Sequence, residues 1–144
     1  MVRLATLDDI DVLNKLLKSL FTQEAEFKVD VKKQTKALKK IIKSKSIGDI
    51  FVVEKKGKVV GMVNILYTYS TALGKKVAIL EDMVVLKKYR KNGMGTKLLK
   101  KVLKILNDSG VERVTLLTDF DNVDAHRFYK KEGFKKSSMV VYRR

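Results

Sequence analysis

The stretch that decides the fold is Arg90-Lys91-Asn92-Gly93-Met94-Gly95-Thr96, which lies where the hydrophobic period of the chain changes. The run before it, residues 78–86, is apolar apart from Glu81 and Asp82 and is typical of a buried strand. After it, apolar residues recur at helical spacing with lysines on the other face: Leu98, Leu99, Val102, Leu103 and Leu106. The stretch therefore joins a strand to an amphipathic helix.

A strand that runs through a basic, glycine-containing loop into a helix is suited to binding an anion. The first turn of a helix has backbone N–H groups without internal partners and carries the positive end of the helix dipole. Gly93 and Gly95 allow a sharp turn and a close approach, and Arg90 adds a positive charge. The sequence has neither the third glycine of a dinucleotide-binding loop nor a G-x-x-x-x-G-K-[ST] run. We expect this loop to bind a phosphate of another kind of ligand.

A second motif follows downstream, Asn122-x-x-Ala125-x-x-Phe128-Tyr129-x-x-x-Gly133-Phe134. The R-x-x-G-x-G loop between strand and helix resembles the acetyl-CoA loop of the GNAT family of N-acetyltransferases. The second motif resembles the late helix and following strand of the same family. The resemblance is strong from about Leu80 to Phe134, and from the N-terminus to Tyr69 it rests on element order alone.

Length and composition predict a single domain, residues 1–144, with one buried core. Cysteine is absent, which excludes disulfides, thiolate catalysis and thiolate metal sites and fits a reducing compartment. No apolar run approaches membrane-spanning length and the first residues lack a signal-peptide core, so we expect a cytoplasmic protein without a membrane partner. No cluster of residues suggests a metal site.

The formal net charge of +16 comes from lysines spread over nearly every predicted element. The phosphates of a coenzyme account for part of this charge, and a lysine-rich composition for the rest. A basic nucleic-acid-binding domain on the same scaffold, without catalysis, is the alternative function. Glu81 and Tyr129 beside a complete glycine loop favour the enzyme, and specific nucleic-acid binding is not expected.

The pattern predicts an α/β protein with the element order βααβββαβαββ, in which a mixed sheet carries helices on both faces. The expected strands are residues 2–5, 50–54, 59–67, 78–86, 114–118, a strand opening at Phe134 and its hairpin return at 139–142. The expected helices begin at about Ile10, after Asp30, after the glycine loop and at Val123.

The resemblance implies acetyl-CoA as co-substrate and assigns residues to it. Backbone groups at Met83, Val84 and Val85 would pair with the pantetheine arm much as a neighbouring strand would. Arg90 and the amides of Lys91, Asn92, Gly93, Met94, Gly95 and Thr96 would hold the pyrophosphate. Asn122 would hydrogen-bond the coenzyme arm, although an Asn before a helix is equally an N-cap.

Acetyl transfer by direct attack needs an acid for the departing thiolate and a base for the attacking amine. The resemblance matches Tyr129 to the acid, with a core aromatic beside Phe128 as the alternative. Glu81 and Asp82 are adjacent on a strand, so we expect them to point to opposite faces. Glu81 is the first choice for the base, because several family members carry their acidic residue at its parity. Asp82 or a water molecule is the alternative.

The acceptor is expected to be a small amine or an amine of a peptide or protein. In the GNAT family the link between the first two helices commonly borders the acceptor site, so Glu24 and Glu26 are candidates for holding a cationic amine, and Tyr67 and Glu81 for lining the pocket. The alternative is that Glu24 and Glu26 are solvated acids at a helix end and that Tyr67 packs on the sheet. Many relatives are homodimers, so the resemblance leaves a homodimer open, but the sequence does not determine the oligomeric state.

Overall fold

The computed structural model describes residues 1–24 and 27–144. Its helices are α1 (Ile10–Phe21), α2 (Val31–Lys43), α3 (Met94–Asp108) and α4 (Val123–Lys131), with short 3-10 turns at Leu7–Asp9 and Lys87–Tyr89. Its strands are β1 (Val2–Leu4), β2 (Gly48–Lys55), β3 (Lys58–Ser70), β4 (Lys75–Val85) and β5 (Val114–Leu116). Up to α4, the element order is the one that the sequence predicts.

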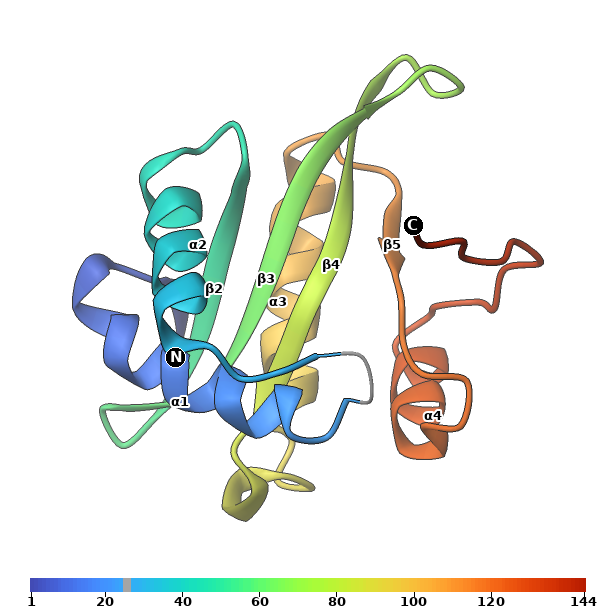
Figure 1. Cartoon of the computed structure of the whole chain (residues 1–144). Helices are drawn as coiled ribbons and strands as arrows, with labels where there is room; N and C mark the ends of the chain where they lie inside the picture. Colours follow the sequence, from blue (N-terminus) through green and yellow to red (C-terminus); the bar gives the residue numbers. More distant parts are fainter. Residues whose placement is uncertain (25–26) are drawn as a thin grey trace.

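The strands form one mixed sheet in the order β1-β2-β3-β4-β5 (Figure 1). The first four strands pair antiparallel, and β5 lies parallel to β4. The parallel pair is short, since only residues 78–80 of β4 pair with residues 114–116. Beyond that point β4 and the chain after β5 diverge, and α4 lies on the far side of the gap (Figure 1).

Helices cover both faces of the sheet, as predicted. One face packs against α1 and α2 through a cluster of fully or nearly buried side chains: Leu13, Leu16, Leu17, Leu38, Ile41, Ile50, Val52, Met62 and Val84. The other face packs against α3 through a second cluster that includes Phe51, Val63, Ile65, Ala78, Leu80, Leu98, Leu99 and Val102. The alternation of apolar side chains along β2 and β3 divides the core between these two layers.

The regular alternation of β4 is interrupted at Glu81. Asn64 of β3 pairs with Asp82, but the next residue, Ile65, pairs with Leu80, so Glu81 is an extra residue in a β-bulge. Leu80 therefore packs on the α3 face while Val84 packs on the α1–α2 face, although the two share parity. The expectation that Glu81 and Asp82 point to opposite faces by simple alternation was wrong, because the bulge resets the alternation between them.

The predicted last two strands do not form. After α4 the described chain, from Phe134 to Arg144, has no strand, and β5 ends at Leu116 instead of Thr118. The side chains of Met139, Val140, Val141 and Tyr142 are 86%, 73%, 57% and 93% exposed. A strand needs a partner for its backbone groups, and β5 offers an edge of only three residues. None of the described helices is both long enough and apolar enough to cross a membrane.

Candidate active site

The open edge of β4 is the central feature of the site. Residues 61–70 of β3 pair with β4 along its whole length, whereas β5 pairs only with residues 78–80. On the β5 side, the backbone from Glu81 to Val85 therefore has no strand partner in the described chain. A ligand with its own amide groups could pair with this edge as a strand does.

The glycine loop connects that edge to α3. Arg90 Nε donates a hydrogen bond of 2.8 Å to the carbonyl of Val85, which ties the loop back to the end of β4. Gly93 is the N-cap of α3 and adopts a left-handed conformation with φ of 75°. The first hydrogen bond of the helix runs from the Lys97 N–H to the Gly93 carbonyl. The N–H groups of Met94, Gly95 and Thr96 therefore precede the internal bonding of the helix and can bind an anion.

Gly95 lies where α3 approaches both β4 and α4. A Cβ at this position would be 3.5 Å from the ring of Phe128 and 3.8 Å from the methyl group of Met83, which are ordinary contact distances. The first turn of α3 is thus next to the open edge of β4 and to α4. The two sequence motifs, which end at Thr96 and begin at Asn122, meet here.

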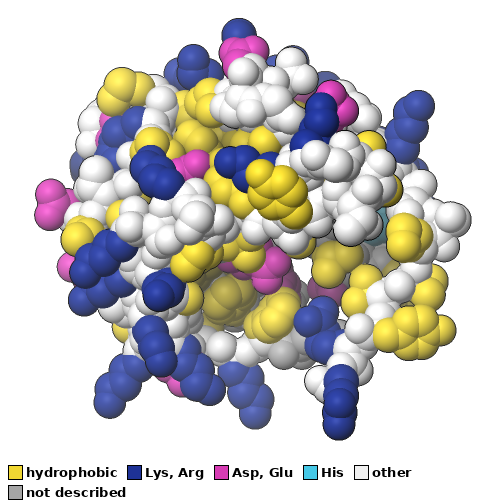
Figure 2. Space-filling view, turned by 90° about the horizontal axis from the view of Figure 1, so that it is seen from above, with side chains coloured by type: hydrophobic (Ala, Val, Ile, Leu, Met, Phe, Trp, Pro, Cys, Tyr) yellow, Lys and Arg dark blue, Asp and Glu magenta, His cyan; other side chains and the backbone are white. Residues whose placement is uncertain are grey.

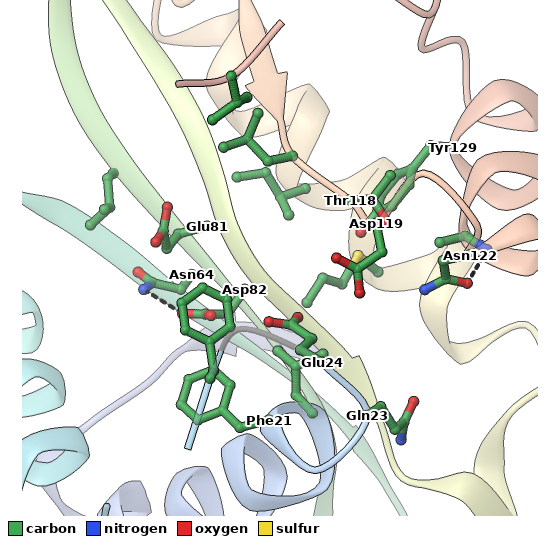
Figure 3. Close-up of a pocket in the computed structure, with 18 of the residues that line it drawn as sticks. Phe21, Gln23, Glu24, Asn64, Glu81, Asp82, Thr118, Asp119, Asn122 and Tyr129 are labelled. Atoms are coloured by element: carbon green, nitrogen blue, oxygen red, sulfur yellow. Dashed lines mark hydrogen bonds between the residues drawn. The ribbon is translucent and has the colours of Figure 1, made fainter. Parts of the chain in front are cut away.

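A cavity of about 680 Å³ lies between these elements (Figure 3). Helices α1 and α2 contribute mainly apolar side chains, β3 contributes Asn64 and Leu66, and β4 contributes Leu80 to Met83. The chain after β5 and the start of α4 form the opposite wall, from Leu117 to Phe120 together with Asn122, Ala125 and Tyr129. The size falls within the usual range for small-molecule sites.

Four carboxylates line this cavity: Glu24, Glu81, Asp82 and Asp119. Because of the bulge, Glu81 and Asp82 both face it. Asp82 Oδ2 accepts a hydrogen bond of 3.1 Å from Asn64 Nδ2 (Figure 3). Burial raises the pKa of Asp82 from 3.8 to about 6; the Asn64 hydrogen bond opposes this and the nearby charge of Glu81 adds to it.

Tyr129 of α4 reaches the cavity from the side opposite Asn64. Its ring makes edge-to-face contacts with Phe128 and Phe134, with centroids 5.2 and 5.6 Å away. Burial raises the pKa of the Tyr129 phenol to about 12, and the negative charge of Glu24 contributes to the rise. The hydroxyl is therefore protonated at neutral pH and can donate a hydrogen bond.

Two other predicted residues have clear positions. Asn122 Oδ1 accepts a 3.1 Å hydrogen bond from the Ala125 N–H, so it caps α4 and also lines the cavity. The Tyr67 hydroxyl donates a 2.7 Å hydrogen bond to Asp49, which together with burial raises the Tyr67 pKa. Tyr67 does not line the cavity, so this geometry does not support its assignment to the acceptor site. Glu26 lies outside the described residues.

Several residues that line the cavity were not predicted from the sequence, notably Phe21, Phe27, Asn64 and Asp119. One signal was available. Asn64 is the only polar side chain in the run from Val59 to Leu66, and a polar residue inside a buried strand marks a site that needs explanation. Among the described residues, His, Asp and Glu side chains form no group of three or more that could hold a metal ion.

Comparison with known proteins identifies the family. Residues 13–134 match the Acetyltransferase (GNAT) family. Among curated relatives, the aminoalkylphosphonate N-acetyltransferase of Salmonella typhimurium is 32% identical over 56% of this chain and 53% of its own. An uncharacterised N-acetyltransferase of Methanocaldococcus jannaschii is 27% identical over 96% of this chain and 62% of its own. This chain thus spans between about half and two thirds of the length of these relatives.

Solved structures support the fold. A possible acetyltransferase from Clostridium difficile superposes with a TM-score of 0.90 at 21% identity, covering 100% of this chain and 95% of the other. An aminoglycoside N-acetyltransferase solved in complex with CoA superposes with a TM-score of 0.84 at 17% identity, covering 100% and 93%. With the family match over most of the chain, the glycine loop at the start of α3 and the open edge of β4, this protein belongs to the GNAT acetyltransferase family.

Proposed function

We propose that this protein transfers the acetyl group of acetyl-CoA to a primary amine by direct attack within a ternary complex. The observation that carries the proposal is the junction of an unpaired strand edge, a helix N-terminus and an acidic cavity at one place in the fold. The acceptor is a small amine or an amine of a peptide or protein. The proposal includes a cytoplasmic protein, in line with a sequence without cysteine, and leaves a homodimer open, as in many relatives.

The residues present fit the coenzyme. Backbone N–H groups from Lys91 to Thr96 would hold the pyrophosphate, and Gly93 makes the turn before α3 in a left-handed conformation. Backbone groups at Met83, Val84 and Val85 can pair with an amide-containing arm. Arg90 holds the loop against the end of β4 by its hydrogen bond to the Val85 carbonyl. Asn122 caps α4, the helix that carries Tyr129. When bound, acetyl-CoA supplies a thioester carbonyl as the acetyl donor.

Residues of this chain would donate a proton to the leaving sulfur and accept a proton from the amine. As the amine nitrogen forms a bond to the carbonyl carbon, the C–S bond breaks, leaving an amide and a thiol. Tyr129 would donate its hydroxyl proton or a hydrogen bond to the sulfur, since its raised pKa keeps it protonated. Glu81, exposed at the bulge, would accept the proton that the amine loses, with Asp82 or a water molecule as the alternative base.

The role of Glu81 has a pH signature. Glu81→Gln is nearly isosteric and removes only the proton acceptor. The rate deficit of this variant should be largest near neutral pH and shrink as pH rises, because more of the acceptor amine arrives already neutral. A pH–rate profile on an amine found by an acceptor panel measures this. A deficit that is flat with pH would move the base to Asp82 or to water.

Gly93 offers a matched test of coenzyme binding. Gly93 and Gly110 flank α3 at its two ends, both have positive φ (75° and 83°), and neither would bring a Cβ within 4 Å of another atom. Alanine therefore introduces a similar backbone strain of about 1–2 kcal/mol at both sites. Gly93→Ala should weaken acetyl-CoA binding by about tenfold or more, because it disturbs the backbone N–H groups proposed to bind the pyrophosphate. Gly110→Ala should leave acetyl-CoA binding unchanged.

Titration calorimetry on both folded variants measures the difference. Equal affinities for acetyl-CoA in Gly93→Ala, Gly110→Ala and the wild type would refute the assignment of the loop.

Titrating the protein with duplex DNA at several salt concentrations tests the alternative function. Binding through phosphates weakens with a log–log slope of about −0.9 per phosphate contacted. Tight, sequence-selective DNA binding without coenzyme affinity would favour the nucleic-acid alternative.

A further inference from the structure

The cavity has the opposite charge to the rest of the protein. The chain contains 32 Lys and Arg residues against 16 Asp and Glu. Among the described residues that line the cavity, the four carboxylates face a single basic side chain, Arg143. Figure 2 shows acidic side chains in a hollow near the middle of one face, with lysine and arginine side chains projecting around it. This contrast favours a cationic guest inside the cavity.

A buried hydrogen-bond acceptor gives a second, independent indication. Asn64 is only 4% exposed, yet its side-chain oxygen Oδ1 has no hydrogen-bond partner among the described residues. Leaving a buried amide oxygen without a partner is unfavourable, because the hydrogen bond that it made to water is not replaced. The Asn64 nitrogen already donates to Asp82 Oδ2 at 3.1 Å. Asn64 and Asp82 are thus neighbours that both line the cavity, and each has an oxygen that can accept a further hydrogen bond. A guest with several N–H groups can donate to both residues.

An ammonium group has the required chemistry. It carries three donors and a positive charge, so it can hydrogen-bond an amide oxygen and pair with a carboxylate at once. The surroundings fit the rest of an aliphatic amine, because Phe21, Ile41 and Leu66 line the same part of the cavity. A methylene chain attached to the ammonium would bury its apolar surface against them.

The position of this pair separates it from the proposed chemistry. Asn64 is opposite Ile50 in the sheet and so lies on the face covered by α1 and α2. Tyr129 packs against the core on the α3 face. Figure 3 shows the Asn64–Asp82 pair and Tyr129 on opposite sides of the β4 ribbon. This placement favours an ammonium at Asn64 and Asp82 that is a different nitrogen from the one that attacks beside Tyr129.

We propose that Asn64 and Asp82 form a subsite for a second ammonium group, so that the acceptor is a linear diamine or polyamine. The inference rests on the proposed amine acetylation but concerns a binding site that is measurable without it. The distal nitrogen pairs with Asn64 Oδ1 and the Asp82 carboxylate, the methylene chain crosses the apolar wall, and the proximal nitrogen reaches the open end of β4. Asp82 then acts as a specificity residue.

The test compares two amines of equal chain length, 1,5-diaminopentane and n-pentylamine, by calorimetry on protein saturated with CoA. In the wild type the diamine should bind about tenfold or more tightly than the monoamine, as expected for a charge-assisted hydrogen bond. Asp82→Asn and Asn64→Leu should each bring the ratio of the two affinities close to one. Asp108→Asn, which removes an exposed carboxylate paired with Lys104, is the charge-matched control and should keep the wild-type ratio.

The outcomes separate this subsite from other roles. Equal affinities for the two amines in the wild type would overturn the proposal, as would a ratio that survives in both cavity variants. In acetylation assays, loss of a base would lower kcat/KM for both amines by the same factor, whereas loss of the subsite lowers the diamine-to-monoamine ratio. If the diamine binds selectively but neither amine is acetylated, the transferase function fails and the subsite stands. Circular dichroism confirms that Asn64→Leu is folded, and Asp82→Asn provides the same test with a nearly isosteric change.

Discussion

The two halves of β4 belong to one strand but have different neighbours and different roles. Residues 78–80 are paired with β3 on one side and β5 on the other, and Ala78 and Leu80 are 1% and 3% exposed. From Glu81 onward the strand is paired with β3 alone, and two carboxylates appear in adjacent positions. The boundary between the halves is the bulge at Glu81.

The difference separates a part of the strand that completes the core from a part that lines the cavity. Where both edges are paired, every backbone group is satisfied internally and apolar side chains complete the core. Where one edge is open, backbone groups are available to a ligand and the sheet tolerates polar side chains that face a cavity. Polar side chains at the open half have fewer hydrogen-bond partners. Burial raises the pKa of Asp82, and the side-chain oxygen of Asn64, on the neighbouring β3, has no partner among the described residues.

The largest effect is expected in the paired half. Ile65 lies opposite Leu80 at the last position before the bulge and is fully buried. Ile65→Ala removes buried methyl and methylene groups and leaves a cavity, so it should lower the free energy of unfolding by about 2–5 kcal/mol. Chemical denaturation measures the loss.

Leu73→Ala, in the turn between β3 and β4 and 41% exposed, is the matched control and should have a much smaller effect. Acetylation per folded molecule should remain close to wild type in Ile65→Ala. If Ile65→Ala and Leu73→Ala are equally mild, the paired half is not the stabilising part of the strand.

A smaller effect, confined to catalysis, is expected across the open half. Tyr129→Phe keeps the ring contacts with Phe128 and Phe134, so stability and coenzyme affinity should barely change. The variant loses only the hydroxyl that donates to the leaving sulfur, and turnover should fall by about 100-fold, or about 2.7 kcal/mol. Tyr142→Phe, at a tyrosine 93% exposed, should leave turnover unchanged. Wild-type turnover in Tyr129→Phe, with chemistry rate-limiting, would make Tyr129 a core aromatic.

The smallest effect is expected from the ionisation of the buried Asp82 carboxyl, which lowers the free energy of unfolding. Its pKa in the folded protein is about 6, compared with an ordinary 3.8, so the folded state holds this proton more tightly than the unfolded state does. Stability therefore falls as pH rises through this window, and the cost is complete above the folded pKa. Asp82→Asn removes the ionisation and should be more stable than wild type by about 1–3 kcal/mol above pH 7.

The advantage of Asp82→Asn should shrink as pH falls and disappear well below the ordinary pKa of 3.8, where the wild-type carboxyl is protonated in both states. Unfolding of both proteins from about pH 3 to pH 8 measures the difference. The other cavity groups, Glu24, Glu81, Asp119 and Arg143, are present in both proteins, so the comparison isolates Asp82. A difference between the two proteins that does not vary with pH would show that ionisation of Asp82 carries no cost.

The sequence by itself determined the local features. The change of period around Gly93, the capping residues Asp30 and Asn122, and the apolar stripes of α1 and α3 depend on residues a few positions apart, and each predicted element up to α4 is present. The glycine loop and the helix at Val123 were recognisable for the same reason. Predicting Tyr129 and Glu81 as site residues required the family resemblance, and the cavity lined by both is consistent with it.

Only the tertiary structure decided features that depend on distant partners. The register of β3 against β4 places the bulge at Glu81, turns both carboxylates toward one cavity and sets Asn64 beside Asp82, eighteen positions away. The alternation of side chains could not reveal this, because one extra residue resets it. The predicted strands after Phe134 failed for a related reason: β-propensity does not create the hydrogen-bonding edge that a strand requires, and the short β5 does not provide one.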